Sequence, residues 1–407
     1  MKLAFLSAFG EMGGAERSLY DLLASLRAAR PRWELTLVVP HTGALASKAE
    51  RLGVRVVVVE FPRGLSRIGD AGAGGPAGRR VGRLKLLLNV AASAPGAALY
   101  LRRLRRTLRR IDPDVIHANG LKSQALAVWA RAGAPVVWHV HDYVSARPLM
   151  ARLVKWCAPR CAAAVVNSRS VGEDLREVCG EGLKIFTLYN AVDLETFSPS
   201  GERLDLDSLS GLPPAEPGAV RVGLLATMAR WKGHETFLKA LSILPREARV
   251  RGYVIGGPIY QTRGSQLGAS ELRECAARLG LEGRVGFTGF VEDPASAIRA
   301  LDVLVHASTE PEPFGLAIVE GMACGRSVVA SSAGGAAEIL NGSEAALSHA
   351  PGDAANLSEQ IGLLARSPEL RTRLGRAGRL VAEERFDRAR LAAELINVYS
   401  EVSAAAS

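Results

Sequence analysis

Short apolar runs alternate with longer stretches of helical periodicity along most of the chain. The helical stretches carry apolar residues three and four positions apart, as Leu19, Leu22, Leu23 and Leu26 do. Apolar runs of this length are typical of strands in a parallel sheet that helices cover on both faces. The pattern predicts an α/β fold with strands at residues 2–7, 35–39, 54–59, 115–118, 136–140, 221–225, 252–255, 303–305 and 327–330.

The alternation breaks in two places. Residues 62–80 are rich in Gly, Ala, Arg and Pro, and residues 198–219 are rich in Pro, Ser and Gly. A chain of 407 residues is long enough for two domains. We therefore expect a first domain at 1–197 with a basic insertion at about 62–110, a linker at 198–219, a second domain at 220–385 and a last helical segment at 386–407. One helix is expected from 356 to 386.

The loop that follows the run at 303–305 holds two glutamates, Glu312 and Glu320. Glu312 would lie at the carboxyl end of a parallel strand, where α/β sheets bind ligands. Glu320 would lie in the helix that follows, whose first N–H groups, from Phe314 to Leu316, are suited to an anion. One loop would then bind hydroxyl groups and a phosphate together. The alternative is two solvated glutamates near a helix start, where acidic residues are favoured.

Glycine-rich turns follow three other predicted strands. Gly13 and Gly14 follow the first run, Gly257 follows the run at 252–255, and Lys232 with Gly233 follows the run at 221–225. Such turns let the backbone approach a phosphate, and Lys232 would add an ammonium group. Each turn by itself is a weak signal, because many α/β proteins have one.

Two histidines end the run at 136–140, in the segment HVHDY. Residues two apart on a strand share a face, so His139 and His141 would point the same way. A metal site would need a third ligand, which the sequence does not nominate. The alternative to a functional role is that each histidine is structural and hydrogen-bonded within the fold.

These segments resemble those of retaining GT-B glycosyltransferases, glycosyltransferase family four. The resemblance rests on EPFGLAIVE and the following GMACGRSVVASSAGGAAEI, on GGAE at 13–16, on HVHDY and on LYNAVDLETFSP at 188–199. It implies two Rossmann-like domains with parallel sheets that face a central cleft, and a last helix that crosses back to the first domain.

The resemblance also assigns roles to residues. Glu312 and His141, with His139 as second choice, would orient the donor sugar, and Glu320 would hold the nucleotide ribose. Lys232 would stabilise the diphosphate leaving group. The family has an Arg where this chain has Thr227, and Arg230 is the expected substitute. The set near the donor is expected to comprise Gly13, Gly14, Arg230, Lys232, Gly257, Phe314, Gly315, Leu316 and Glu320.

Positive charge is concentrated in one segment. Residues 61–111 carry twelve Lys and Arg and one Asp, while the formal net charge of the whole chain is +10. Leu99, Leu101, Leu104 and Leu108 recur at helical spacing among the arginines. Residues 79–110 therefore predict a basic amphipathic helix on an anionic membrane surface, with an ordinary arginine-faced surface helix as the alternative. Nucleic acid is the poorer interpretation because the segment lacks interleaved aromatic residues.

Other features exclude classes of protein. The apolar run near residue 1 is shorter than a signal peptide's, and no run reaches membrane-spanning length, so a cytoplasmic protein is expected, peripheral on the inner face of the membrane if the basic helix binds there. Five cysteines without zinc-finger spacing indicate reduced thiols. Asp205 and Asp207 form a DxD pair in the linker, where a metal site is not expected.

We therefore expect an enzyme that moves a sugar from a UDP-, GDP- or ADP-sugar to a glycan or lipid-linked acceptor with retention. No metal, other cofactor or protein base is expected, because in the family the leaving phosphate takes the acceptor proton. The alternatives are a nucleotide-sugar epimerase or sugar-phosphate synthase on the same fold, and a non-catalytic membrane-surface protein that binds a nucleotide sugar.

Overall fold

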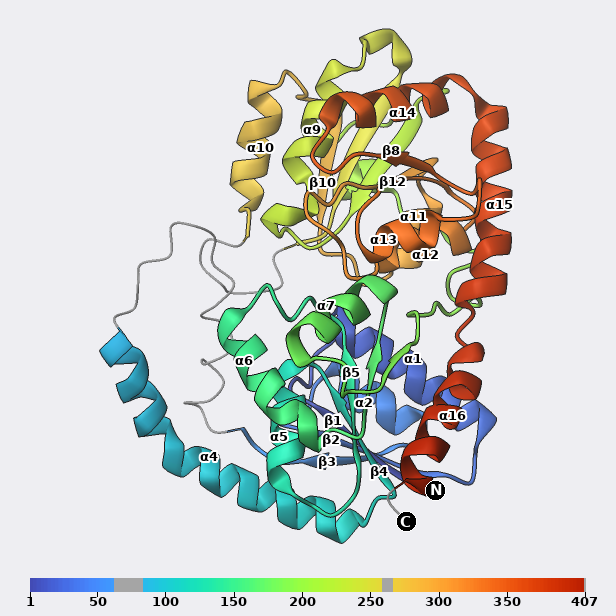
Figure 1. Ribbon diagram of the computed structural model, residues 1–407. Helices are drawn as coiled ribbons and strands as arrows, with labels where there is room; N and C mark the ends of the chain where they lie inside the picture. The colour runs from blue at the N-terminus through green and yellow to red at the C-terminus, as the bar shows by residue number, and fades with distance from the viewer. Residues whose placement is uncertain (62–82, 258–265, 406–407) are drawn as a thin grey trace. The chain divides into compact units, whose positions relative to one another are not determined.

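The computed structural model describes residues 1–61, 83–257 and 266–405, and the side chains of residues 83–95 are outside the description. The chain forms two compact units. Unit 1 comprises Met1–Asn190 and Arg388–Ser407, and unit 2 comprises Ala191–Asp387. Each unit is a parallel sheet covered by helices (Figure 1).

In unit 1 the described strands pair in the order β3-β2-β1-β4-β5-β6-β7, and all the pairs are parallel. The strands are β1 (Lys2–Ser7), β2 (Glu34–Val39), β3 (Arg55–Val58), β4 (Val115–Asn119), β5 (Val136–Val140), β6 (Ala163–Val166) and β7 (Ile185–Thr187). The helices are α1 (Gly14–Ala29), α2 (Ala44–Arg51), α4 (Arg83–Ile111), α5 (Leu121–Ala130), α6 (Pro148–Cys157), α7 (Arg169–Cys179) and α16 (Arg390–Ala404).

In unit 2 the order is β10-β9-β8-β11-β12-β13, again parallel throughout. The strands are β8 (Val220–Leu225), β9 (Val250–Ile255), β10 (Val285–Gly289), β11 (Val303–His306), β12 (Ser327–Ser331) and β13 (Leu347–His349). The helices are α8 (Leu206–Leu209), α9 (His234–Ile243), α10 (Ala269–Arg278), α11 (Pro294–Arg299), α12 (Leu316–Ala323), α13 (Gly335–Leu340), α14 (Ala354–Arg366) and α15 (Pro368–Phe386).

Both sheets reverse their strand order at one point. The reversal lies between β1 and β4 in unit 1 and between β8 and β11 in unit 2. The crevice outside the carboxyl ends of the strands at such a reversal is where open α/β sheets bind ligands. The loops after these four strands are therefore the first place to look for a functional site.

The chain passes from unit 1 to unit 2 between Asn190 and Ala191, so the expected linker at 198–219 lies within unit 2. Asp207 lies in that stretch and is buried, and its carboxylate accepts from Arg221 at 3.0 Å, Arg251 at 2.8 Å and the Tyr253 hydroxyl at 2.7 Å. Burial acts to raise the pKa of Asp207, but the hydrogen bonds from Arg251, Tyr253 and the Ala215 N–H outweigh it and lower the pKa to about 2. Asp205 accepts from the Ser208 N–H at the start of α8. Asp207 thus joins this stretch to β8 and β9 of unit 2.

The helix expected at 356–386 is two helices. α14 ends at Arg366, the Ser367 hydroxyl accepts from the Leu370 N–H, and Pro368 occupies the first position of α15. A capping hydroxyl followed by proline favours a new helix start over continuation. At the other end of the chain, α16 belongs to unit 1, where it packs on α1 and β4.

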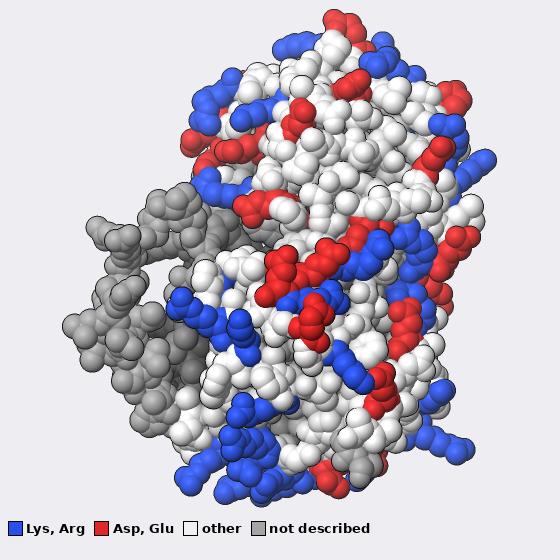
Figure 2. All heavy atoms as spheres, in the orientation of Figure 1, with Lys and Arg blue, Asp and Glu red and all other residues white. Residues whose placement is uncertain are grey.

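Three side chains of the basic helix α4 face the core of unit 1. Tyr100, Leu104 and Leu108 are buried in the core under the sheet, whereas Leu99 is 51% exposed. Six arginines of the same stretch are exposed: Arg102, Arg103, Arg105, Arg106, Arg109 and Arg110. Figure 2 shows this blue cluster over the end of α4. The expectation that the leucine face meets a membrane is therefore wrong for Leu104 and Leu108, and residues 79–82 lie outside the described residues.

Candidate active site

In unit 2 the loops at the reversal of strand order bring a lysine and a glutamate together. Lys232 follows β8 and Glu312 follows β11. The Lys232 ammonium lies 2.7 Å from each oxygen of the Glu312 carboxylate, and 4.0 Å from the centre of the Trp231 ring. Both charged side chains are largely buried, with exposed fractions of 19% for Lys232 and 10% for Glu312.

Two further groups bind the same carboxylate. The Ser308 hydroxyl donates to Glu312 Oε2 at 2.8 Å, and His306 Nε2 lies 3.3 Å from that oxygen. Burial by itself acts to raise the pKa of Glu312, but the Lys232 charge and the His306 hydrogen bond outweigh it and hold the pKa well below the usual carboxyl range. Glu312 is therefore an anion at any ordinary pH.

Backbone contacts explain why the two loops meet. The Thr309 N–H donates to the Trp231 carbonyl at 2.8 Å, and the Gly335 N–H donates to the Glu312 carbonyl at 2.8 Å. Gly233 has φ +73°, and a Cβ there would lie 1.8 Å from the Ala307 carbonyl oxygen. Only glycine permits this approach. A Cβ on Gly335 would similarly lie 2.2 Å from the Pro313 carbonyl oxygen.

The other predicted donor-site residues of unit 2 fall into three groups. Glu320 is buried in α12, Gly315 precedes that helix with φ +103°, and Leu316 begins it. The Phe314 ring is buried against Phe386. Gly257 follows β9, but its neighbour Gly256 is the residue that the backbone requires, since it has φ +132° and a Cβ there would lie 2.1 Å from the Ala226 carbonyl oxygen.

Arg230 makes a different contact from Lys232. Its guanidinium pairs with Glu271 at 3.0 Å, and both side chains are nearly half exposed. Such a pair adds little stability, so it would not prevent Arg230 from moving to a ligand.

In unit 1 the corresponding loops carry Gly13 and Gly14 after β1, Asn119 at the end of β4 and His141 after β5. The Asn119 amide donates to the Ala15 carbonyl at 3.3 Å, and its carbonyl oxygen lies 2.7 Å from His141 Nε2. This arrangement places a proton on His141 Nε2 and the lone pair on Nδ1. Asn119 therefore links His141 to the first turn of α1.

A buried chain of rings lies behind His141. The His139 ring is 4.0 Å from the His141 ring, His139 Nδ1 is 3.2 Å from His117 Nε2, and His117 Nδ1 is 2.9 Å from the Tyr399 hydroxyl of α16. Burial lowers the pKa of both His117 and His141 to about 3. The cluster is therefore neutral near pH 7, and His139 belongs to this support of His141.

Sequence reasoning missed several of these residues. It passed over Asn119, His117, Tyr399, His306 and Ser308, although His306 and Ser308 stand within six residues of Glu312. Their position directly after strands at the reversal could have indicated Asn119, His306 and Ser308. Nothing in the sequence pairs Tyr399 with His117, which is 282 positions away.

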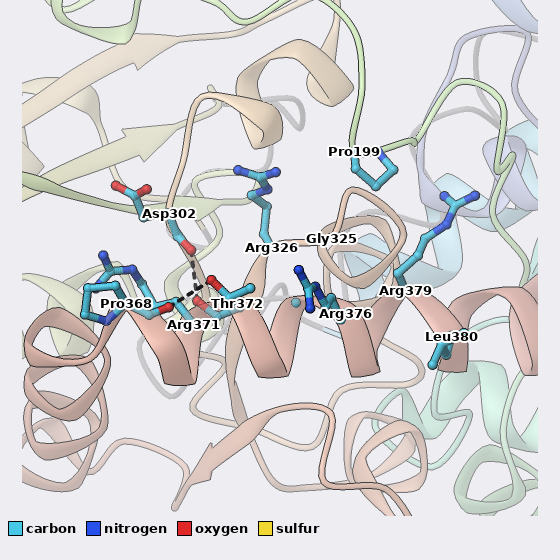
Figure 3. A pocket seen from close by; sticks show the side chains of 12 residues that line it. Pro199, Asp302, Gly325, Arg326, Pro368, Arg371, Thr372, Arg376, Arg379 and Leu380 are labelled. Carbon is cyan, nitrogen blue, oxygen red and sulfur yellow. Dashed lines mark hydrogen bonds between the residues drawn. The ribbon is translucent and has the colours of Figure 1, made fainter.

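A cavity of about 620 Å³ lies elsewhere in unit 2, at the amino ends of β11 and β12 (Figure 3). Arginines line it, and several of their guanidiniums donate to carbonyls at helix ends. Arg326 donates to the Cys324 carbonyl, Arg371 to the Leu364 carbonyl and Arg379 to the Ala323 carbonyl. These bonds satisfy the ends of α12 and α14. The cavity is at the opposite edge of the sheet from Glu312.

Two absences apply to the described part of the chain. Within it, no three His, Cys, Asp or Glu side chains are grouped so that they could hold a metal ion. No helix among the described residues is both long and apolar enough to cross a membrane.

Comparison with known proteins identifies the family. Residues 12–196 match the model of Glycosyltransferase Family 4, and residues 217–381 match that of Glycosyl transferases group 1. A D-inositol 3-phosphate glycosyltransferase of Xylanimonas cellulosilytica is 30% identical over 249 residues, which cover 59% of this chain and 57% of that protein. This match thus spans little more than half of that relative.

Two more relatives match over greater lengths. A phosphatidyl-myo-inositol mannosyltransferase of Mycobacterium leprae is 28% identical over 75% of this chain and 78% of its own. The structure of Anabaena Alr3699/HepE in complex with UDP-glucose has a TM-score of 0.78 at 25% identity, covering 98% of this chain and all of that one. With both family models matched and the fold shared, this chain belongs to the GT-B glycosyltransferases of family four.

Proposed function

We propose that this protein transfers a hexose from a nucleotide diphosphate sugar to an acceptor hydroxyl, with retention at the anomeric carbon. The observation that carries the proposal is the Lys232–Glu312 arrangement at the reversal of strand order in unit 2. It puts a phosphate-binding cation and a hydroxyl-binding anion side by side, which is what a sugar diphosphate requires. The Anabaena relative's complex with UDP-glucose makes a uridine nucleotide the first candidate donor.

Each residue has a role in this proposal. The bond between the anomeric carbon and the diphosphate oxygen breaks, and Lys232 stabilises the negative charge that develops on the leaving group. The acceptor oxygen bonds to the same face of the sugar, and its proton passes to the leaving phosphate. Glu312 and His141 orient the sugar, Glu320 binds the ribose, and Arg230 assists Lys232 after leaving Glu271.

The backbone completes the donor site in the proposal. Gly315 and Leu316, together with Phe314, present the start of α12 to the diphosphate, and Gly257 follows β9 on the neighbouring strand. In unit 1 the turn at Gly13 and Gly14, which follows β1, is the corresponding backbone element of the proposed donor site. These assignments follow the family resemblance and the position of each loop after its strand.

Donor binding is the first test. A thermal-shift panel with UDP, GDP, ADP and their sugar conjugates is expected to show one nucleotide stabilising the protein, because a ligand stabilises in proportion to the logarithm of its excess over Kd. Glu320→Ala should lose about tenfold or more in affinity for that nucleotide, since a hydrogen bond to a charged group is worth about 1.5–3 kcal/mol. If no nucleotide shifts the melting temperature, the proposal fails.

Acceptor dependence separates the alternatives. The names of two relatives make inositol phosphates and phosphatidylinositol the first acceptors to try. A transferase releases nucleotide in step with acceptor glycosylation, and NMR of the product gives the anomeric configuration. Conversion of the sugar without an added acceptor would indicate an epimerase, and binding without turnover under every acceptor would indicate a non-catalytic protein.

We also propose that unit 1 associates peripherally with anionic membranes through the arginine face of α4. The support is the cluster of six exposed arginines from Arg102 to Arg110 (Figure 2). Because Leu104 and Leu108 are buried in the core, the attraction would be electrostatic and would weaken as salt is added. In liposome flotation, changing the six arginines to glutamine should abolish binding to anionic vesicles, and unchanged binding would remove the proposal.

A further inference from the structure

Glu312 already has hydrogen-bond contacts with three side chains in the structure. Oε1 accepts from Lys232, and Oε2 lies within 3.3 Å of Lys232, Ser308 and His306. A carboxylate offers about four lone-pair sites, two on each oxygen. The Lys232 ammonium occupies a position on both oxygens that a sugar hydroxyl would need.

The same contact occupies Lys232. Its ammonium lies 2.7 Å from both oxygens of Glu312, so this one carboxylate takes up a large part of its donor capacity. The pair is a short, charge-assisted interaction in a largely buried place, where such bonds are strongest. A diphosphate must therefore compete with Glu312 for the lysine, and a sugar must compete with the lysine for Glu312.

Building on the proposed function, we propose that the Lys232–Glu312 pair closes the sugar subsite until a diphosphate draws Lys232 away. Ser308 and His306 are positioning residues that hold Glu312 in place when the lysine leaves. Glu312 then binds sugar hydroxyl groups only on molecules that also carry a diphosphate. Free sugars and sugar monophosphates, which lack the second phosphate charge, are selected against.

Ser308 and His306 are suited to this part. Both lie on the β11 end of the loop, and both side chains are nearly inaccessible to solvent. The Ser308 hydroxyl is also 3.1 Å from His306 Nε2, so the two side chains restrain one another. The His349 ring is 3.1 Å from the His306 carbonyl and adds a further restraint from β13. Neither of these contacts involves Lys232.

The decisive experiment is nucleotide affinity of the full chain by calorimetry, with UDP and UDP-glucose as probes. Glu312→Gln should bind UDP about tenfold more tightly than the unsubstituted protein, because Lys232 is no longer held. The same variant should lose the preference for UDP-glucose over UDP. Unchanged or weaker UDP binding by this variant would overturn the proposal.

Glu310→Gln is the matched control. Glu310 is an exposed residue of the same loop, so the substitution removes one negative charge two residues away. If general repulsion of the diphosphate explained the result, both variants would tighten binding. The proposal requires that Glu310→Gln leave the affinity for UDP within about twofold, a difference below 0.5 kcal/mol.

The positioning role has its own variants. Ser308→Ala should leave the affinity for UDP nearly unchanged and reduce the preference for UDP-glucose, whereas Ser308→Thr, which keeps the hydroxyl, should restore it. A structure of the UDP complex should place the Lys232 ammonium on phosphate and away from Glu312 Oε1; a lysine still bound by both Glu312 oxygens would overturn the proposal. If no nucleotide binds any of these proteins, it is the proposed function that fails.

Discussion

The two units present the same element of topology with opposite electrostatics. At the reversal of strand order, unit 2 has a buried ion pair, Lys232 with Glu312, whereas unit 1 has, on β4 and after the neighbouring β5, a neutral cluster built on His117 and His141. In unit 2 a charge is kept because an opposite charge compensates for burial. In unit 1 burial is accommodated by giving up charge. The comparison shows that a parallel sheet provides the position, and the local donors and acceptors decide what chemistry is available there.

The largest expected effect comes from removing the cation of the Lys232–Glu312 pair in unit 2. Lys232→Met leaves the Glu312 carboxylate buried without its cation, which should lower the free energy of unfolding by about 3 kcal/mol and kcat/KM by about 10²–10³-fold. Adding Glu312→Gln should restore part of the stability and none of the activity. Urea unfolding and steady-state kinetics measure the two effects, and equal stability of the single and double variants would contradict the coupling.

The next effect tests the backbone that brings the pair together. Gly233→Ala should cost about 2–4 kcal/mol and weaken nucleotide binding, because the new Cβ meets the Ala307 carbonyl. Gly283 has nearly the same φ, +71°, with no atom within 4 Å of its Cβ position. Gly283→Ala should therefore cost only about 1–2 kcal/mol, the penalty of the left-handed conformation. Equal losses in melting temperature would show that the close approach is unimportant.

The neutral half of the comparison is sensitive to pH. Because burial lowers the pKa of His117 and His141 to about 3, the folded protein binds fewer protons than the unfolded chain below pH 6.5. Stability from these residues is complete above pH 6.5 and is lost as the pH falls toward 3, by up to about 1.4 kcal/mol per histidine and pH unit. Hydrogen exchange at pH 7.5, 6.5 and 5.5 should show β4 and β5 losing protection.

The loop around Glu312 provides the contrast in that experiment. The pKa of Glu312 is lowered from its usual value of 4.5, so its contribution to stability is retained throughout this pH range and is lost progressively only as the pH falls below about 4.5. Peptides from β11 and α12 should accordingly keep more of their protection than those from β4 and β5. The reverse order would mean that the histidines are not held neutral by burial.

The smallest effect concerns the exposed pair. Arg230→Gln removes a surface ion pair with Glu271, so stability should change by less than about 1 kcal/mol. Nucleotide affinity should fall only a few-fold if Arg230 assists Lys232 at the diphosphate. Calorimetry measures the nucleotide affinity. A loss of affinity as large as that of Lys232→Met would mean that Arg230 contributes as much as Lys232 to diphosphate binding.

The sequence by itself determined the alternation of strands and helices and the loops that carry the chemistry. The length of a short apolar run indicates the length of a buried strand, so the strands near Val303 and Val136 were predictable. Residues that directly follow such strands must lie at the carboxyl edge of the sheet. Glu312, Lys232 and His141 could be nominated for that reason and by resemblance to a family. The break at Pro368 was also present in the local sequence, although periodicity alone did not reveal it.

Only the tertiary structure decided which side chains meet. Lys232 binds Glu312 from 80 positions away, and Arg230, two residues earlier, binds Glu271 instead. Leu104 faces the core although the arginines beside it suggested a membrane, and Asp207, in a stretch expected to be a linker, is bound by Arg221 and Arg251. A helical or strand period fixes the direction of a side chain relative to its own element. The partner is set by how the elements pack, and that information is not local to any stretch of the chain.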